Sequence, residues 1–309
     1  MVSRDVLVLG DANPDLVMRL ETLDVGGAQR EILVEEGLLT LGGSGAIFSA
    51  GAARLGLRVG FVGVVGDDLF GRFVTGELEA RGVDVSSSVV RSDVATGVSV
   101  VLSSPADRTI YTAAGATAAL RPGDVDGAGL SASSRHVHVA SYFLQDALRP
   151  GLAVLLEAAR AAGATTSLDP NWDPRERWDR ALVEILDLVD VFLPNEAELV
   201  AIAGDDDVER ASAALAERAG MVVVKRGGAG ALARRGDETV HAAAADLDVV
   251  DTTGAGDAFD AGFVRAHLEG WSLERTLAFA NACGALSCRA VGGVDGQPTF
   301  DEALAIANP

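Results

Sequence analysis

The stretch VVDTTGAGDAFDAGF, residues 249–263, places three residues with almost no side chain directly before Asp257. The apolar residues 247–250 predict a short strand, residues 251–257 a turn, and the residues that follow a helix. The first amides of a helix lack intrahelical partners and carry partial positive charge, so they suit an anion. A helix cap alone would explain Asp257, but it would not require Gly-Ala-Gly before it. The pattern therefore favours amides that face a phosphoryl group, beside a carboxylate that deprotonates an attacking hydroxyl.

Composition narrows the class of protein. The chain has 309 residues, of which 49% are hydrophobic, so a large apolar core is expected. Its formal net charge of −20 argues against partners with phosphate surfaces, namely nucleic acid and anionic membranes. Cys283 and Cys288 point in different directions on a predicted helix, so no disulfide is expected. We find no signal peptide and no apolar run of about 18 residues, and we expect a cytoplasmic protein.

Short apolar segments alternate with helical patterns along most of the chain. This alternation predicts an α/β fold with a doubly wound, mostly parallel sheet that is covered by helices on both faces. The predicted strands are residues 5–10, 59–65, 135–140, 165–169, 190–194 and 221–226. The predicted helices are residues 44–56, 68–82, 151–163 and 207–220, followed by about 255–269 and 273–289.

Two regions do not follow this alternation of strands and helices. Residues 16–41 and 96–114 lack helical periodicity and alternate like antiparallel strands, so they predict a small side sheet. No long linker divides the chain, and we expect one domain over residues 1–309 with this sheet as a lid. A second glycine-rich segment, residues 41–56, follows the predicted lid, and tight helix packing explains it as well as ligand binding does.

Two common phosphate-binding motifs are absent from the sequence. There is no Walker A sequence, and no Gly-x-Gly-x-x-Gly lies between the first strand and the first helix. Phosphate binding must therefore rest on another arrangement.

The two glycine-rich segments together resemble a known family. GGSGAIFSAGAARLG (residues 42–56) and DTTGAGDAFDAGF (251–263) are similar to the two signature motifs of the ribokinase-like (PfkB) family of carbohydrate and nucleoside kinases. GDANPD (10–15), LPNEAEL (193–199) and VVVKRGGAGA (222–231) extend the similarity over nearly the whole chain. The resemblance implies a ribokinase-like fold with a β-sheet lid over the sugar site.

The resemblance also implies roles for single residues in catalysis and acceptor binding. Asp257 matches the catalytic base, and the amides of Gly254, Ala255 and Gly256 match the anion hole for the transferred group. The implied substrate-binding residues are Asn13, Asp15, Gly42, Gly43, Ser44, Ile47, Arg108, Tyr142 and Asp257.

Several of these acceptor-side residues have an alternative explanation. Asn13 and Asp15 could form a turn around Pro14, and Arg108 could be a solvated hairpin tip. Tyr142 could stack on a sugar or a base, or it could pack in the core. Ribokinases carry Lys and Asn where this chain has Ser44 and Ile47, which argues against strict ribokinase specificity.

On the nucleotide side, the resemblance implies a second set of residues. These are Asn195, Glu198, Lys225, Gly227, Gly228, Gly230, Asn281, Asp169 and Asn171. Glu198 would organise magnesium, in part through water, although Asn195 and Glu198 also have the spacing of a helix capping box. Lys225, the single lysine of the chain, could contact phosphate or could be a surface charge. Asp251 would contribute to a monovalent-cation site.

The function expected from these motifs is transfer of the γ-phosphoryl group of ATP to a hydroxymethyl group of a sugar or sugar-like alcohol. ATP and Mg²⁺ are the implied cofactors, with K⁺ as a further one, and the family suggests a homodimer through the lid. A nucleoside kinase remains an alternative because Ile47, Tyr142 and Phe143 are apolar. A non-catalytic sugar or nucleotide sensor is a third hypothesis, and the intact Asp257 argues against it.

Overall fold

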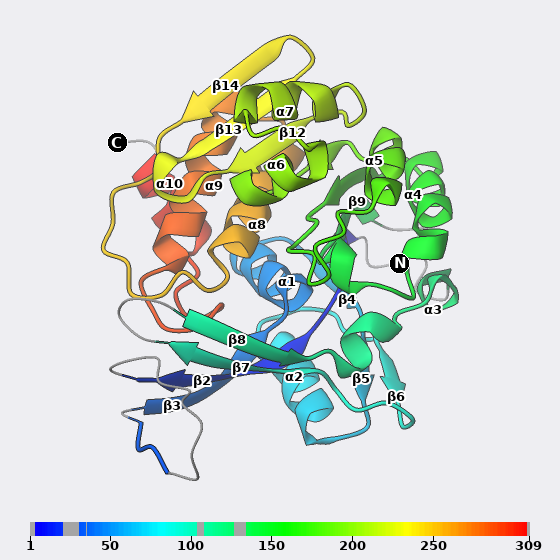
Figure 1. Ribbon diagram of the computed structural model, residues 1–309, viewed down its shortest axis with the longest axis vertical. Coiled ribbons are helices and arrows are strands. Elements are labelled where there is room, and N and C mark those ends of the chain that lie inside the picture. The colour runs from blue at the N-terminus through cyan, green and yellow to red at the C-terminus, as the bar shows by residue number, and fades with distance from the viewer. Residues whose placement is uncertain (1–3, 21–30, 35, 104–107, 127–133, 308–309) are drawn as a thin grey trace.

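The computed structural model of the chain describes residues 4–20, 31–34, 36–103, 108–126 and 134–307 (Figure 1). Its larger sheet has eight strands in the order β14-β13-β12-β11-β10-β9-β1-β4. Neighbouring strands from β4 to β12 are parallel, while β12, β13 and β14 pair antiparallel. The strands are β1 (Arg4–Leu9), β4 (Val59–Val62), β9 (Ser134–Val139), β10 (Thr165–Leu168), β11 (Val191–Phe192), β12 (Val222–Lys225), β13 (Ala231–Arg235) and β14 (Glu238–Ala242).

Helices cover both faces of this sheet, as the sequence predicts. The α-helices are α1 (Ser44–Arg54), α2 (Leu69–Ala80), α3 (Pro122–Asp126), α4 (Leu152–Ala161), α5 (Arg180–Ile185), α6 (Glu196–Ala203), α7 (Val208–Ala216), α8 (Ala255–Leu268), α9 (Leu273–Ser287) and α10 (Phe300–Ala307). The 3₁₀ turns are η1 (Gly115–Ala119), η2 (Tyr142–Leu144), η3 (Arg149–Gly151), η4 (Leu186–Leu188) and η5 (Gly227–Ala229).

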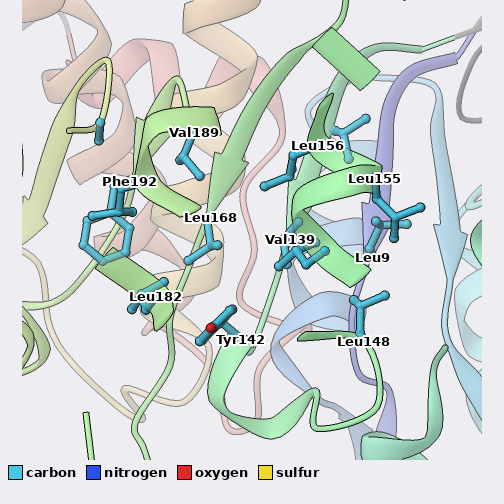
Figure 2. Close-up of a cluster of buried hydrophobic side chains, with 14 of the residues drawn as sticks. Leu9, Val139, Tyr142, Leu148, Leu155, Leu156, Leu168, Leu182, Val189 and Phe192 are labelled. Carbon is cyan, nitrogen blue, oxygen red and sulfur yellow. The ribbon is translucent and has the colours of Figure 1, made fainter. Parts of the chain in front are cut away.

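The core follows the two-residue period of the strands. In β1, Leu7 and Leu9 belong to an apolar cluster with side chains of α4, α5 and α7, whereas Val6 and Val8 belong to a cluster with α1, α2 and α8. Figure 2 shows the first cluster, in which Leu9 from β1 lies near Leu155 and Leu156 from α4. Each fully buried leucine or phenylalanine contributes roughly 1.5–3 kcal/mol, so these clusters fix the sheet that carries the site.

A smaller, four-stranded sheet lies beside the larger one, at the lower left of Figure 1. Its strands are β3 (Glu36–Gly42), β2 (Asn13–Arg19), β7 (Val98–Ser103) and β8 (Arg108–Ala113), in that order. β2 follows closely on β1, and β3 leads directly into α1, so the sheet is joined to the carboxyl end of β1. A third, two-stranded parallel sheet consists of β5 (Val64–Gly66) and β6 (Val89–Arg91).

The expectation of a strand at residues 247–250 is wrong. The connection between β14 and α8 contains no strand, Leu247 packs against an apolar cluster, and the exposed fractions of Val249 and Val250 are 63% and 56%. The backbone N–H of Val250 instead donates to the carbonyl of Cys288, at the end of α9. A short apolar run forms a strand only where a sheet edge can pair with it, and here the connection passes over a helix end.

Other expectations can be compared with the structure directly. Helix α8 begins at Ala255 as predicted, and β2 begins at Asn13, before the predicted residue 16. Cys283 and Cys288 are both buried, and neither is part of a disulfide. Among the described residues, no helix combines the length and the apolar character that crossing a membrane requires.

Candidate active site

The turn before α8 depends on Gly254, the N-cap of that helix. Gly254 has φ 73° and ψ 4°, in the left-handed region that favours glycine. A Cβ atom at this position would lie 2.8 Å from the Cα atom of Gly293 and 2.9 Å from Cγ2 of Ile47. The residue must therefore be glycine for two reasons, its backbone conformation and its close contacts.

A cavity of about 480 Å³ opens in front of this turn, a volume typical of small-molecule sites. Gly254, Ala255, Gly256 and Asp257 all line it. The N–H of Ala258 donates to the carbonyl of Gly254 at 2.9 Å and closes the first turn of α8. The N–H of Ala255 has a long contact of 3.3 Å with the carbonyl of Thr252, so this one of the three predicted amides already has a protein partner.

The same cavity gathers all nine residues predicted for the nucleotide side. They come from the loop after β10, from α6, from β12 with η5, and from α9. The predicted residues that line the cavity are Ser44, Asp169, Asn171, Asn195, Glu198, Lys225, Gly227, Gly228, Gly230, Gly254, Ala255, Gly256, Asp257 and Asn281.

The surroundings of Asp257 raise the pKa of its carboxyl group. Desolvation, reinforced by the negative charge of Asp169, raises the pKa of Asp257 well above its usual range, while Lys225 and a hydrogen bond with the Ser44 side chain oppose this shift. A carboxylate with a raised pKa is a stronger base for a hydroxyl proton. Asp257 is therefore a carboxyl group on the cavity wall whose affinity for a proton is raised.

A chain of hydrogen bonds supports the Ser44 side of the cavity. Nδ2 of Asn171 lies 3.3 Å from Oγ of Ser44 and 3.1 Å from Oγ of Ser141. Asn171 and Ser141 both have φ 55°, a conformation that non-glycine residues rarely adopt. The backbone N–H of Asn171 donates to Asp169 at 2.7 Å, which helps to hold this loop.

Lys225 is not a surface charge. Its side chain is 11% exposed, and Nζ lies 2.7 Å from Oδ2 of Asp169 and 2.9 Å from Oδ2 of Asp260. Burial favours the neutral forms of all three groups, but the Lys225 ammonium holds the pKa of Asp169 below its usual value. Burial outweighs the same charge at Asp260 and raises its pKa well above the usual range.

Asn195 and Glu198 form the predicted capping box at the start of α6. The N–H of Glu198 donates to Oδ1 of Asn195 at 2.9 Å, and the N–H of Asn195 donates to Oε2 of Glu198 at 2.8 Å. Burial, followed by the charge of Asp169, raises the pKa of Glu198 to about 7. Both residues also line the cavity, so capping and ligand binding are compatible here.

With this geometry known, comparison with other proteins identifies the family. Residues 3–299 match the model of the pfkB family of carbohydrate kinases. The chain belongs to the PfkB family. It is 33% identical over 302 residues to the ATP-dependent ribose-1-phosphate kinase of Halopiger xanaduensis, covering 97% of each chain. It is 34% identical over 272 residues to the fructokinase of Salmonella typhimurium, covering 83% of this chain and 88% of the other.

A solved structure supports the same fold for this PfkB-family kinase. An E. coli protein described as a ribokinase II, in complex with ATP and Mg²⁺, superposes with a TM-score of 0.85 at 27% identity, covering 98% of both chains. The chain is thus a carbohydrate kinase with the ribokinase-like fold.

Several of the residues predicted to bind the acceptor lie together at the small sheet. Asn13 and Asp15 lie in β2, so the alternative of a simple turn around Pro14 is wrong. Nδ2 of Asn13 donates to Oδ1 of Asp15 at 2.9 Å, and burial raises the pKa of Asp15 to about 6. A Cβ atom at Gly42 would lie 2.1 Å from Oδ1 of Asp15, which explains why glycine ends β3.

Three further predicted residues differ in their surroundings. Gly43 has φ 87° and is the N-cap of α1. Ile47 is buried against Gly254 and Gly293. The side chain of Asp251 accepts hydrogen bonds from the backbone N–H groups of Thr253 and Gly292, both at 2.9 Å. Ile47 and Asp251 therefore contact the turn before α8 or its supports and are not part of the cavity wall.

The placement of Tyr142 corrects the expectation that it contacts the acceptor. Tyr142 is 2% exposed and belongs to the apolar core (Figure 2). Its ring packs edge-on against that of Phe143 at a ring distance of 5.2 Å. The packing alternative is therefore correct, because the 3₁₀ turn η2 directs the ring into the core. The side chain of Arg108 lies outside the described residues.

Sequence reasoning missed several residues of the site. Asp260 binds Lys225, and its only local signal was a position one helical turn after Asp257. Asp11, which accepts the N–H of Gly45 at 3.1 Å, was also missed at the start of α1. The remaining wall residues that were not predicted are Arg226, Ala244, Ala245, Val249, Thr252, Phe259, Gly284, Ala285 and Cys288.

Proposed function

We propose that this enzyme transfers the γ-phosphoryl group of ATP to a hydroxymethyl group of a sugar or sugar-like alcohol. One observation carries the proposal: Asp257 and the turn Gly254–Gly256 line the same cavity as Asn195, Glu198 and Lys225. A base, an amide turn and nucleotide-side polar groups in one cavity are the parts that phosphoryl transfer requires.

In this proposal Asp257 accepts the proton of the acceptor hydroxyl. The acceptor oxygen then bonds to the γ-phosphorus, the bond from that phosphorus to the β–γ bridging oxygen breaks, and ADP leaves. The amides at the start of α8 face the charge that develops on the transferred group. The left-handed Gly254 and the absence of side chains at Gly254 and Gly256 let a phosphoryl oxygen approach the backbone.

The cavity wall fits a magnesium–nucleotide complex. Asp169, Glu198 and Asp257 bring carboxyl oxygens to the cavity wall. Burial raises the pKa of Glu198 to about 7, and a bound cation would favour its ionised form. Among the described residues no three acidic, histidine or cysteine side chains are close enough to bind a metal together, so Glu198 would hold Mg²⁺ in part through water. When bound, Mg²⁺ neutralises charge on the β- and γ-phosphates.

The rest of the nucleotide would follow η5 and α9 in this proposal. Gly227, Gly228 and Gly230 leave room beside the phosphates, and Asn281 lies near the base. Nδ2 of Asn281 donates to the carbonyl of Ala243 at 2.9 Å, so it also holds the wall formed by the connection after β14.

A potassium site is a further part of the proposal. Asp251 links the turn before α8 to Gly292, so a monovalent cation bound there would stiffen the amide turn.

A homodimer through the small sheet is also part of the proposal. This sheet would act as the lid and as the dimer contact, since β3 and β8 are its two outer strands and Leu39, Ile110 and Tyr111 are exposed on them. Light scattering of the purified chain tests the dimer.

The nucleoside-kinase alternative loses much of its support. Of the three apolar residues that suggested it, Tyr142 and Phe143 are buried in the core.

A coupled ADP-release screen over pentoses, pentose 1-phosphates, hexoses, keto acids and nucleosides, with K⁺ or Na⁺, tests the proposed function. We expect turnover with a member of the sugar classes, and turnover with nucleosides alone would contradict it.

A further inference from the structure

Lys225 is enclosed by carboxylates on two elements. It ends β12, and its ammonium contacts Asp169, after β10, at 2.7 Å and Asp260, in α8, at 2.9 Å. These two contacts orient the ammonium within the cavity wall. A lysine that reached freely for a nucleotide phosphate would not need two buried partners in the protein.

Asp260 is fully buried and lies three residues after Asp257 in α8. Its Oδ2 atom contacts Lys225, whereas Oδ1 has no hydrogen-bond partner among the described atoms. A half-satisfied buried carboxyl group is costly, and the Lys225 contact is the interaction that offsets this cost. Asp260 therefore joins α8 to β12 through its contact with Lys225, and it also interacts with the Asp169 side chain.

The ammonium of Lys225 also lies against the backbone of the anion-binding turn. A Cβ atom at Gly256 would lie 3.6 Å from Nζ of Lys225. The positive charge is thus next to the first turn of α8, whose residues Gly254–Asp257 line the cavity. In a site of low dielectric, such a charge acts strongly on a nearby anion.

We propose that Asp260 and Lys225 are positioning residues for phosphoryl transfer, in which Asp260 holds the Lys225 ammonium beneath the Gly254–Gly256 turn. The charge then adds to the field of the backbone amides where the transferred group gains negative charge. This inference rests on the proposed function. It differs from a simple phosphate contact because Asp260, which does not line the cavity, is required for it.

Steady-state kinetics of D260N, K225M and the double variant test the pair. We expect D260N to lower kcat about 10-fold and K225M about 10²-fold, with KM for the acceptor changed by less than about 2-fold. Because the two residues act together, we expect the double variant to be no worse than K225M. D124N is the matched control: it breaks the partly buried Arg91–Asp124 pair (2.8 Å) outside the cavity and should lower the Tm without changing kcat.

The single lysine provides a readout that needs no acceptor. Labelling with ¹³C,¹⁵N-lysine gives one side-chain signal, and we expect D260N to shift it and to speed hydrogen exchange of the ammonium, while D124N leaves both unchanged. If no acceptor is phosphorylated by the wild type, the proposed function fails, but the lysine signal still reports on the pair.

Three results would overturn the inference. They are a D260N enzyme with wild-type kcat, losses that add in the double variant, and an unchanged lysine signal in D260N. If D260N does not fold, the double variant, which leaves no unpaired ammonium, decides the question, and wild-type kcat in that protein would refute the role of the pair.

Discussion

The proposed function divides the site into a phosphoryl side and an acceptor side, which are built in different ways. The phosphoryl side consists of a backbone turn at Gly254–Gly256 together with buried charges, and one cavity collects it from α6, α8, α9 and the ends of β10 and β12. In the same proposal the acceptor side would consist mainly of side chains on β2, such as Asn13 and Asp15, which lie outside the wall of that cavity. The difference is that backbone geometry defines one side and side-chain identity the other.

This difference explains which properties follow from the motifs. An amide turn serves any transferred phosphoryl group, because it contacts the part that all acceptors share. A site of side-chain hydrogen-bond donors and acceptors discriminates between acceptors, because an unmatched buried polar group is costly. Substitutions on the two sides should therefore change different kinetic constants.

The largest effect is expected for Asp257→Asn. Loss of the base should lower kcat about 10³-fold, while the Kd for ADP changes by less than about 2-fold, since the amide has nearly the same shape. Stopped assays of turnover and calorimetry with ADP measure the two quantities. E209Q, which changes an acidic residue in the first turn of α7, is the control and should be fully active. Full activity of D257N would exclude Asp257 as the base.

Gly254→Ala tests the backbone part of the phosphoryl side. The new Cβ would meet Gly293 at 2.8 Å and Ile47 at 2.9 Å in a left-handed conformation. We expect a loss of kcat of about 10²-fold and a destabilisation of about 1–3 kcal/mol, measured by kinetics and by chemical denaturation. G76A in α2, where a Cβ has no neighbour within 4 Å, should keep full activity and gain up to about 1 kcal/mol. Normal turnover in G254A would show that the turn tolerates displacement.

Gly42→Ala tests the acceptor side alone. Its Cβ would overlap Oδ1 of Asp15 at 2.1 Å and push this carboxyl group out of position. We expect KM for the acceptor to rise about 10-fold with KM for ATP nearly unchanged, because only ground-state acceptor contacts are disturbed. G37A in the same strand, where the nearest atom is Sδ of Met18 at 3.5 Å, is the matched control. Equal increases in both KM values would mean that the two sides are not separable.

The sequence predicted the elements whose signals are local. The apolar runs of the parallel strands, the capping box of Asn195 and Glu198, and the start of α8 after Gly254 all depend on residues close together in the chain. Residues whose roles depend on distant partners were missed or misplaced. Asp260 contacts a lysine 35 positions away, and Tyr142 lies in the core as the first residue of the 3₁₀ turn η2. The strand expected at 247–250 does not form, and the backbone of Val250 pairs with the carbonyl of Cys288 at the end of α9 instead.

Asp15 gives the smallest predicted effect, which appears in the pH dependence of stability. Burial raises the pKa of Asp15 from 3.8 to about 6, so the folded protein binds this proton more tightly than the unfolded chain does. The stabilising contribution is therefore fully present below the unfolded pKa, near 4, and is lost as the pH rises through about 6. Between pH 5 and pH 7 the free energy of unfolding of the wild type should fall by about 1 kcal/mol relative to that of D15N. Urea denaturation of both proteins at several pH values measures this difference. Parallel pH profiles would show that Asp15 is ionised throughout, in which case the acceptor side carries a permanent negative charge and would favour acceptors rich in hydrogen-bond donors.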